Sequence, residues 1–156
     1  MDQLRRTFLK NAGIAGAAIA AIGTGLLRPV EVLAATWNKL AFTSTNVADA
    51  MRNSNYNGAT ESKDILVKTP DIAENGASVP VEVISNIPAT TSIAIFVEKN
   101  QTPLIADFDL SNGAEPYIST RIKMSQTSLV RIAVRAGGKV YTQAKEVKVT
   151  IGGCGG

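Results

Sequence analysis

The fold of this chain is decided near its C-terminal end, by the segment Leu129-Val130-Arg131-Ile132-Ala133-Val134-Arg135-Ala136-Gly137-Gly138-Lys139 and the run to Ile151 that follows it. In 129–135, apolar side chains at alternate positions face one way and two arginines face the other, which is the period of a half-buried β-strand. Gly137-Gly138 predicts a two-residue hairpin turn. A second strand over 139–151 continues the alternation. The segment therefore predicts a β-hairpin with one buried face.

The same pattern extends toward the N-terminus. Short apolar or alternating runs are separated by turn-forming residues at fairly even spacing, which is typical of a β-sandwich. The expected strands are 65–68, 79–84, 93–97, 104–110, 117–124, 129–135 and 139–151. We therefore predict an all-β, immunoglobulin-like β-sandwich of about seven strands, with a small barrel as the main alternative. The run 93–97 is almost continuously apolar and suits a central strand.

A short helix is expected before the first strand, over 45–52, with Thr45 or Asn46 as its N-cap. Trp37 precedes this helix, so it is not the buried strand tryptophan of antibody domains. The chain has one cysteine and so no internal disulfide. Any likeness to immunoglobulins is therefore one of architecture only.

The N-terminus resembles an export signal. Arg5-Arg6-Thr7-Phe8-Leu9-Lys10 precedes an uncharged stretch rich in Ala and Gly, which is the layout of a twin-arginine signal with Arg5, Arg6, Phe8 and Leu9 as its characteristic residues. The stretch is marginal as a membrane span, which disfavours a permanent anchor. We expect cleavage after Val32-Leu33-Ala34, so that the mature chain begins at Ala35 or Thr36.

Three segments are expected: a signal peptide over 1–34, an immunoglobulin-like domain over 35–151 and a flexible arm over 152–156. Export by the twin-arginine route predicts a periplasmic protein with no membrane attachment after cleavage. Four of the sixteen basic and two of the thirteen acidic residues belong to 1–34, so the mature chain is nearly neutral. It lacks the basic face that nucleic-acid binding requires.

The chain contains no histidine, which removes serine-histidine and cysteine-histidine couples and imidazole metal sites. We expect no catalytic residue, cofactor or metal. Asp107 and Asp109 lie two residues apart and would share one face of a strand. Neither is tied by sequence to a nucleophile or a second acid, so we interpret them as part of a solvated strand face.

The only cysteine lies in the terminal sequence Gly152-Gly153-Cys154-Gly155-Gly156. Glycine has no Cβ and accepts φ of either sign, so Gly152, Gly153, Gly155 and Gly156 predict a thin, flexible arm that presents the thiol. An odd cysteine in an exported protein indicates intermolecular pairing or a free reactive thiol. Such an arm suits a carrier whose substrate is attached to Cys154 and moved between enzymes. A frayed terminus with an incidental cysteine is the alternative.

Four stretches resemble the SoxY family, the sulfur carriers of the periplasmic thiosulfate-oxidising (Sox) system: 73–81, 97–100, 119–124 and the terminal 147–156. The resemblance implies an immunoglobulin-like domain that forms a heterodimer with a SoxZ-like subunit. It implies that a c-type cytochrome enzyme attaches thiosulfate to Cys154 as a cysteine S-thiosulfonate, and that a hydrolase releases sulfate. A dehydrogenase component would act on the remaining sulfur. The implied protein is a carrier and not an enzyme.

Two other functions use the same cysteine. A periplasmic thiol oxidoreductase or peroxidase would use Cys154 as its catalytic nucleophile, but it would require a lowered thiol pKa and usually a resolving cysteine. A structural or binding module would use the cysteine only to crosslink a dimer.

Overall fold

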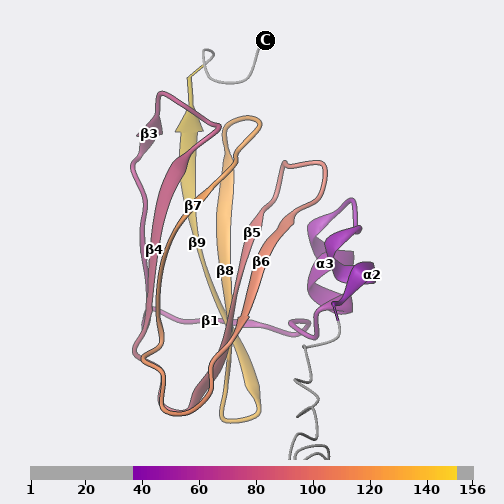
Figure 1. Ribbon diagram of the computed structural model, residues 1–156, viewed down its shortest axis with the longest axis vertical. Helices are drawn as coiled ribbons and strands as arrows, with labels where there is room; N and C mark the ends of the chain where they lie inside the picture. The colour runs from indigo at the N-terminus through magenta and orange to yellow at the C-terminus, as the bar shows by residue number, and fades with distance from the viewer. Residues whose placement is uncertain (1–36, 151–156) are drawn as a thin grey trace, which may run out of the picture. The chain divides into compact units, whose positions relative to one another are not determined.

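The computed structural model describes residues 37–150 (Figure 1). Two short helices come first, α2 (Lys39–Phe42) and α3 (Val47–Asn53). Nine strands follow: β1 (Thr60–Glu61), β2 (Ile65–Lys68), β3 (Ile72–Ala73), β4 (Val79–Ser85), β5 (Thr90–Val97), β6 (Leu104–Asp109), β7 (Tyr117–Ile122), β8 (Ser128–Ala136) and β9 (Lys139–Val149). No helix within these residues is long and apolar enough to cross a membrane.

The strands form two sheets (Figure 1). The larger has the order β1-β9-β8-β5-β6, with β3 also paired to β9, and the smaller has the order β2-β4-β7. Alternate apolar side chains from both sheets meet in a common core, which includes Val81, Val83, Ile93, Ile95, Ile132 and Val134. This packing of two sheets confirms the predicted immunoglobulin-like β-sandwich over the small barrel.

A second apolar cluster lies on the other face of the larger sheet, beneath the two helices. Ala94 and Phe96 of β5 pack there with Tyr56 and with Ala41 and Ala50 from the helices. Both faces of β5 are therefore covered, which explains why its sequence is almost continuously apolar rather than alternating. The described chain thus has three layers: the helices, the larger sheet and the smaller sheet.

All seven expected strands are present, with ends that differ from expectation by a few residues within the described part of the chain. The hairpin turn is confirmed, because Gly137 and Gly138 both have positive φ, +56° and +74°. Of the two candidate residues, Asn46 is the N-cap of α3, because its side chain accepts a hydrogen bond from the N–H of Asp49. Trp37 is 64% exposed and stacks on Phe42, outside the core as expected.

Three elements were not expected: α2, β1 and β3. Each is only two to four residues long, too short to show a hydrophobic period. The two strands form because parallel pairing with β9 satisfies their backbone groups, Thr60 with Tyr141 and Ile72 with Lys148. Asn38 is the N-cap of helix α2, and its side chain accepts a hydrogen bond from the N–H of Ala41.

Candidate functional site

The residues that the sequence singled out for function lie outside the described part of the chain. They are Cys154 with Gly152, Gly153, Gly155 and Gly156, and the signal residues Arg5, Arg6, Phe8 and Leu9. The predicted boundaries at 34 and 151 also fall there. The structure does describe the chain up to Thr150, four residues before Cys154. The candidate site is therefore built from the residues that hold this end of β9.

Parallel pairing with β3 holds one side of the end of β9. Ile72 is paired with Lys148, and Ala73 with Val149. The N–H of Lys148 donates to the carbonyl of Asp71 at 2.9 Å, and the N–H of Thr150 donates to the carbonyl of Ala73 at 3.1 Å. The backbone of β9 is thus hydrogen-bonded up to the last described residue.

A side chain holds the opposite side. Strand β8 begins at Ser128, which is paired with Val147, so its ladder ends before Val149. The hydroxyl of Thr127 accepts the N–H of Val149 at 2.9 Å and lies 3.5 Å from the carbonyl oxygen of the same residue. Thr127 therefore continues the hydrogen bonding of β9 where the partner strand has stopped.

Gly76 lies against the same strand end. Its carbonyl accepts the N–H of Met124 at 2.7 Å. A Cβ at this position would collide with the carbonyl oxygen of Met124 and would lie 2.9 Å from Cγ1 of Val149. The absence of a side chain at Gly76 is therefore what lets the β3–β4 turn pack closely against β9 and the β7–β8 turn.

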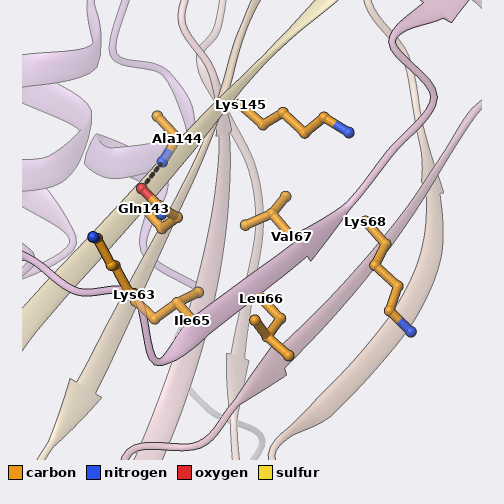
Figure 2. Close-up of a pocket in the computed structure, with 8 residues that line it drawn as sticks. All are labelled: Lys63, Ile65, Leu66, Val67, Lys68, Gln143, Ala144 and Lys145. Carbon is orange, nitrogen blue, oxygen red and sulfur yellow. Dashed lines mark hydrogen bonds between the residues drawn. The ribbon is translucent and has the colours of Figure 1, made fainter.

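Lys145 fastens the segment that leads into β3. Its ammonium group donates to the carbonyl of Thr69 at 2.8 Å and lies 3.0 Å from the carboxylate of Asp71. Figure 2 shows Lys145 with the other residues that line the groove between β2 and β9. The groove is lined by Lys63, Ile65, Leu66, Val67, Lys68, Gln143, Ala144 and Lys145. This lining contains neither a thiol nor a carboxylate, and it offers no nucleophile or acid-base pair.

The β5–β6 turn is tied to the same end of the sandwich (Figure 1). The side chain of Asn100 donates to the carbonyl of Lys123 at 2.7 Å and accepts from the N–H of Ser125 at 3.0 Å. The N–H of Lys99 donates to the hydroxyl of Ser128 at 3.0 Å. Hydrogen bonds therefore link the described parts of all four stretches that resemble SoxY. Asn100 binds Lys123, and Met124 binds Gly76. Thr150, at the end of the fourth stretch, binds Ala73.

Away from the end of β9, a polar cluster lies beneath the helices, on the outer face of the larger sheet. The hydroxyl of Tyr56 donates to Asp107 at 2.6 Å and lies 2.9 Å from the hydroxyl of Ser92. Arg135 donates to Ser92 at 2.6 Å, pairs with Asp109 at 3.2 Å and stacks over the ring of Tyr56, 4.6 Å from its centroid. The cluster joins the chain after α3 to β5, β6 and β8.

Burial determines the electrostatics of this cluster. It raises the pKa of Asp107, against the opposing effects of the hydrogen bond from Tyr56 and the charge of Arg135. Burial and the hydrogen bond to Asp107 raise the pKa of Tyr56 well above its usual range. Asp107 and Asp109 do share a face of β6. Only Asp109 is exposed, however, and the expected solvated face is wrong for Asp107, because Tyr56 partly covers it.

Residues 37–150 contain no group of three or more histidine, cysteine, aspartate or glutamate side chains that could hold a metal ion. The polar cluster consists of a tyrosine, a serine, an arginine and two aspartates whose groups bind one another. Its geometry is that of a link between layers.

Comparison with known families decides the identity. The model of a family described as "Sulfur oxidation protein SoxY" matches residues 52–154. The chain belongs to the SoxY family. The match covers most of the described sandwich and ends at the only cysteine of the chain.

Among solved structures, the sulfur carrier protein SoxY from Chlorobium limicola f thiosulfatophilum matches with 40% sequence identity and a TM-score of 0.61. The alignment covers 70% of this chain and 96% of the Chlorobium protein. The SoxY sandwich is therefore shared over nearly the whole length of that relative.

A superoxide reductase (neelaredoxin) from Ignicoccus hospitalis is also similar, with 14% identity, a TM-score of 0.50 and coverage of 55% of this chain and 80% of its own. Its T24K variant matches with 14% identity and a TM-score of 0.51, over 66% and 90%. At this identity the likeness shows the fold alone. No curated protein matches the chain.

The residues that hold the end of β9 could not be identified from the sequence. Gly76 lies within a stretch that resembles SoxY, but nothing in the local sequence indicates that it lies close to Val149. Thr127 lies in a turn and carries no motif. Tyr56 lies near the turn after α3, 36 residues from Ser92 and 51 from Asp107. Only the folded chain brings these groups together.

Proposed function

We propose that this SoxY-family protein is a non-catalytic carrier that holds sulfur intermediates of thiosulfate oxidation covalently on Cys154. The observation that supports this most strongly is that the family match extends to residue 154, the only cysteine in the chain. The Chlorobium relative is named a sulfur carrier protein, and a carrier with one thiol can attach its cargo only there.

The proposed loading reaction is oxidative. The thiol of Cys154 and thiosulfate form a sulfur–sulfur bond, which gives the S-thiosulfonate and releases one proton and two electrons. A c-type cytochrome component of the Sox system accepts the electrons. A hydrolase then adds water and releases sulfate, leaving a persulfide on Cys154 for a dehydrogenase component. The chain has no histidine and no second cysteine, so these partners supply the acid-base and redox groups.

The proposed working unit is a periplasmic heterodimer with a SoxZ-like subunit. The twin-arginine sequence Arg5-Arg6-Thr7-Phe8-Leu9-Lys10 supports export of a folded complex, in which a partner without its own signal would travel as a passenger. On this proposal residues 1–34 are removed and no membrane attachment remains.

Mass spectrometry of the protein isolated from cells given thiosulfate tests the proposal. We expect the peptide that contains Cys154 to gain the mass of S2O3, because R–SH becomes R–S–S–SO3H, and this added mass to be lost on treatment with a thiol reductant. The Cys154→Ser variant should show no adduct and no thiosulfate oxidation, yet it should form the heterodimer normally. Only free thiol and simple disulfide on Cys154 would contradict the proposal.

Assays of the isolated protein and of cells that carry Cys154→Ser distinguish the carrier from the two other functions. Turnover of peroxide or of a disulfide by the isolated protein would support a thiol oxidoreductase. Full thiosulfate oxidation by cells that carry Cys154→Ser would support a structural module whose cysteine is incidental.

A further inference from the structure

We propose that Thr127 and Gly76 are positioning residues for Cys154: they fix the end of β9 and so determine the position from which the chain continues toward Cys154. Together with β3 they form what we call the β9 clamp, defined as Ile72–Ala73, Gly76 and Thr127. The inference rests on the proposed carrier function of Cys154 and adds the residues that govern its presentation to partner enzymes.

Hydrogen bonds hold the last two residues of β9 and Thr150, which follows them. Three consecutive N–H groups, those of Lys148, Val149 and Thr150, have acceptors at 2.9, 2.9 and 3.1 Å, alternately on the β3 side and the Thr127 side. Lys148 and Thr150 are exposed, so water could satisfy their backbone groups instead. The hydrogen bonds therefore contribute little net stability, and their main effect is to fix the position of the strand end.

On the β8 side, the hydroxyl of Thr127 alone supplies the hydrogen-bond acceptor that a partner strand would otherwise provide. Val147 is the last residue of β9 paired with β8. Beyond it, the N–H of Val149 depends on the hydroxyl of Thr127. Valine has nearly the shape of threonine but cannot accept this hydrogen bond, whereas serine can.

Gly76 packs closely against both Met124 and Val149. A methyl group there would meet the carbonyl oxygen of Met124 on one side and Cγ1 of Val149 on the other. The carbonyl is backbone, and Val149 is the strand residue that the clamp holds, so a side chain at position 76 requires the β3–β4 turn to move away from the β7–β8 turn and from Val149.

The clamp sets the number of residues between Cys154 and the last described residue that is hydrogen-bonded to the sandwich, which is Thr150. Cys154 is four residues beyond Thr150, a span of at most about 14 Å at ~3.3–3.6 Å per residue. If the clamp opened, Lys148 to Thr150 would be added to that span. The effective concentration of a tethered group falls roughly as the −3/2 power of tether length, so this change alone would lower it about two- to threefold.

The deciding experiment compares Thr127→Val with Thr127→Ser in the complete heterodimer. Loading with thiosulfate by the c-type cytochrome component is measured with the carrier as the varied substrate, so that kcat and KM separate. We expect kcat/KM to fall in Thr127→Val through a higher KM, by at most about two- to threefold because the hydrogen bonds to the β3 side remain, and to return toward the wild-type value in Thr127→Ser. Alkylation of Cys154 by iodoacetamide should be equal in all three proteins, because the thiol itself is unchanged.

Amide hydrogen exchange at Val149 and Thr150 reports the clamp directly. We expect faster exchange at both in Thr127→Val and little change in Thr127→Ser. Faster exchange with an unchanged kcat/KM would overturn the positioning role, and unchanged exchange would overturn the clamp. If the wild type is not loaded at all, the carrier proposal fails, while the exchange comparison still decides whether Thr127 holds the strand end.

Gly76→Ala provides a second variant, with Gly113→Ala as its matched control. Gly113 has open space around it and a φ of +73°, so alanine there should strain the backbone without touching the clamp. We expect Gly76→Ala to lower kcat/KM at least as much as Thr127→Val, and Gly113→Ala to lower only the thermal stability. Equal loading by both glycine variants would contradict the inference.

Discussion

The helical layer, which packs on the larger sheet, and the end of β9, which belongs to that sheet, are held in place by different physical means. Beneath α2 and α3, Tyr56, Ala94 and Phe96 are completely buried, and Tyr56 joins a cluster of polar groups that bind one another. At the end of β9, Lys148 and Thr150 are exposed, and hydrogen bonds to β3 and Thr127 hold the backbone.

The two regions contribute differently: one mainly to the free energy of unfolding, the other mainly to the position of the end of β9. Burial of an aromatic side chain contributes about 1.5–3 kcal/mol, whereas an exposed hydrogen bond that water can replace contributes about 0.5–1.5 kcal/mol or less. The helical layer therefore stabilises the sandwich, while the β9 clamp mainly fixes the position of Val149 and Thr150. A carrier requires both, because its partners must find the thiol in a consistent place.

The largest effect is expected at the centre of the helical layer. Phe96→Ala should lower the free energy of unfolding by about 3–5 kcal/mol, because Phe96 is fully buried and meets the ring of Tyr56 edge-on, with centroids 6.2 Å apart. The matched change in the clamp is Ile72→Ala, at a side chain 58% exposed, and should cost less than about 1 kcal/mol. Urea unfolding of both variants measures the contrast.

Similar losses for Phe96→Ala and Ile72→Ala would remove the distinction between the two regions. If Phe96→Ala does not fold, Phe96→Leu keeps most of the apolar volume and should still be less stable than Ile72→Ala.

A smaller effect is expected when the polar cluster loses one atom. Tyr56→Phe should lower the free energy of unfolding by about 1–3 kcal/mol, because the hydroxyl binds Asp107 and contacts Ser92, which is buried. Tyr117→Phe is the matched control, since Tyr117 is 45% exposed and lies outside this cluster. Equal melting temperatures for the two variants would show that the cluster does not stabilise the helical layer.

The smallest effect is a pH dependence above the ordinary tyrosine pKa of 10.0. The pKa of Tyr56 is raised by burial, so the unfolded chain loses this proton before the folded chain does. Stability from Tyr56 is therefore complete below pH 10 and falls above it, by at most about 1.4 kcal/mol per pH unit. Wild type and Tyr56→Phe should converge in stability as the pH rises above 10. A constant difference would contradict the assignment.

Much of the sandwich was predictable because strands leave a local signal. Alternation marked the β8–β9 hairpin, and Gly137-Gly138 marked its turn through their positive φ. The continuous apolar run in β5 marked a central strand, although the sequence did not reveal that helices cover its second face. The packing of one sheet against the other, and the parallel pairing of β1 and β3 with β9, are not indicated by any local sequence pattern.

Seven of the nine described strands and the single thiol could be found from the sequence alone, because side-chain periodicity is local and a residue that occurs once needs no structure to be found. The sequence also carried the SoxY resemblance that the family comparison confirms. Only the tertiary structure decided what holds the end of β9. Gly76 and Thr127 lie far apart in the chain, and their roles come from contacts with Val149 that form only when the sheets and turns assemble.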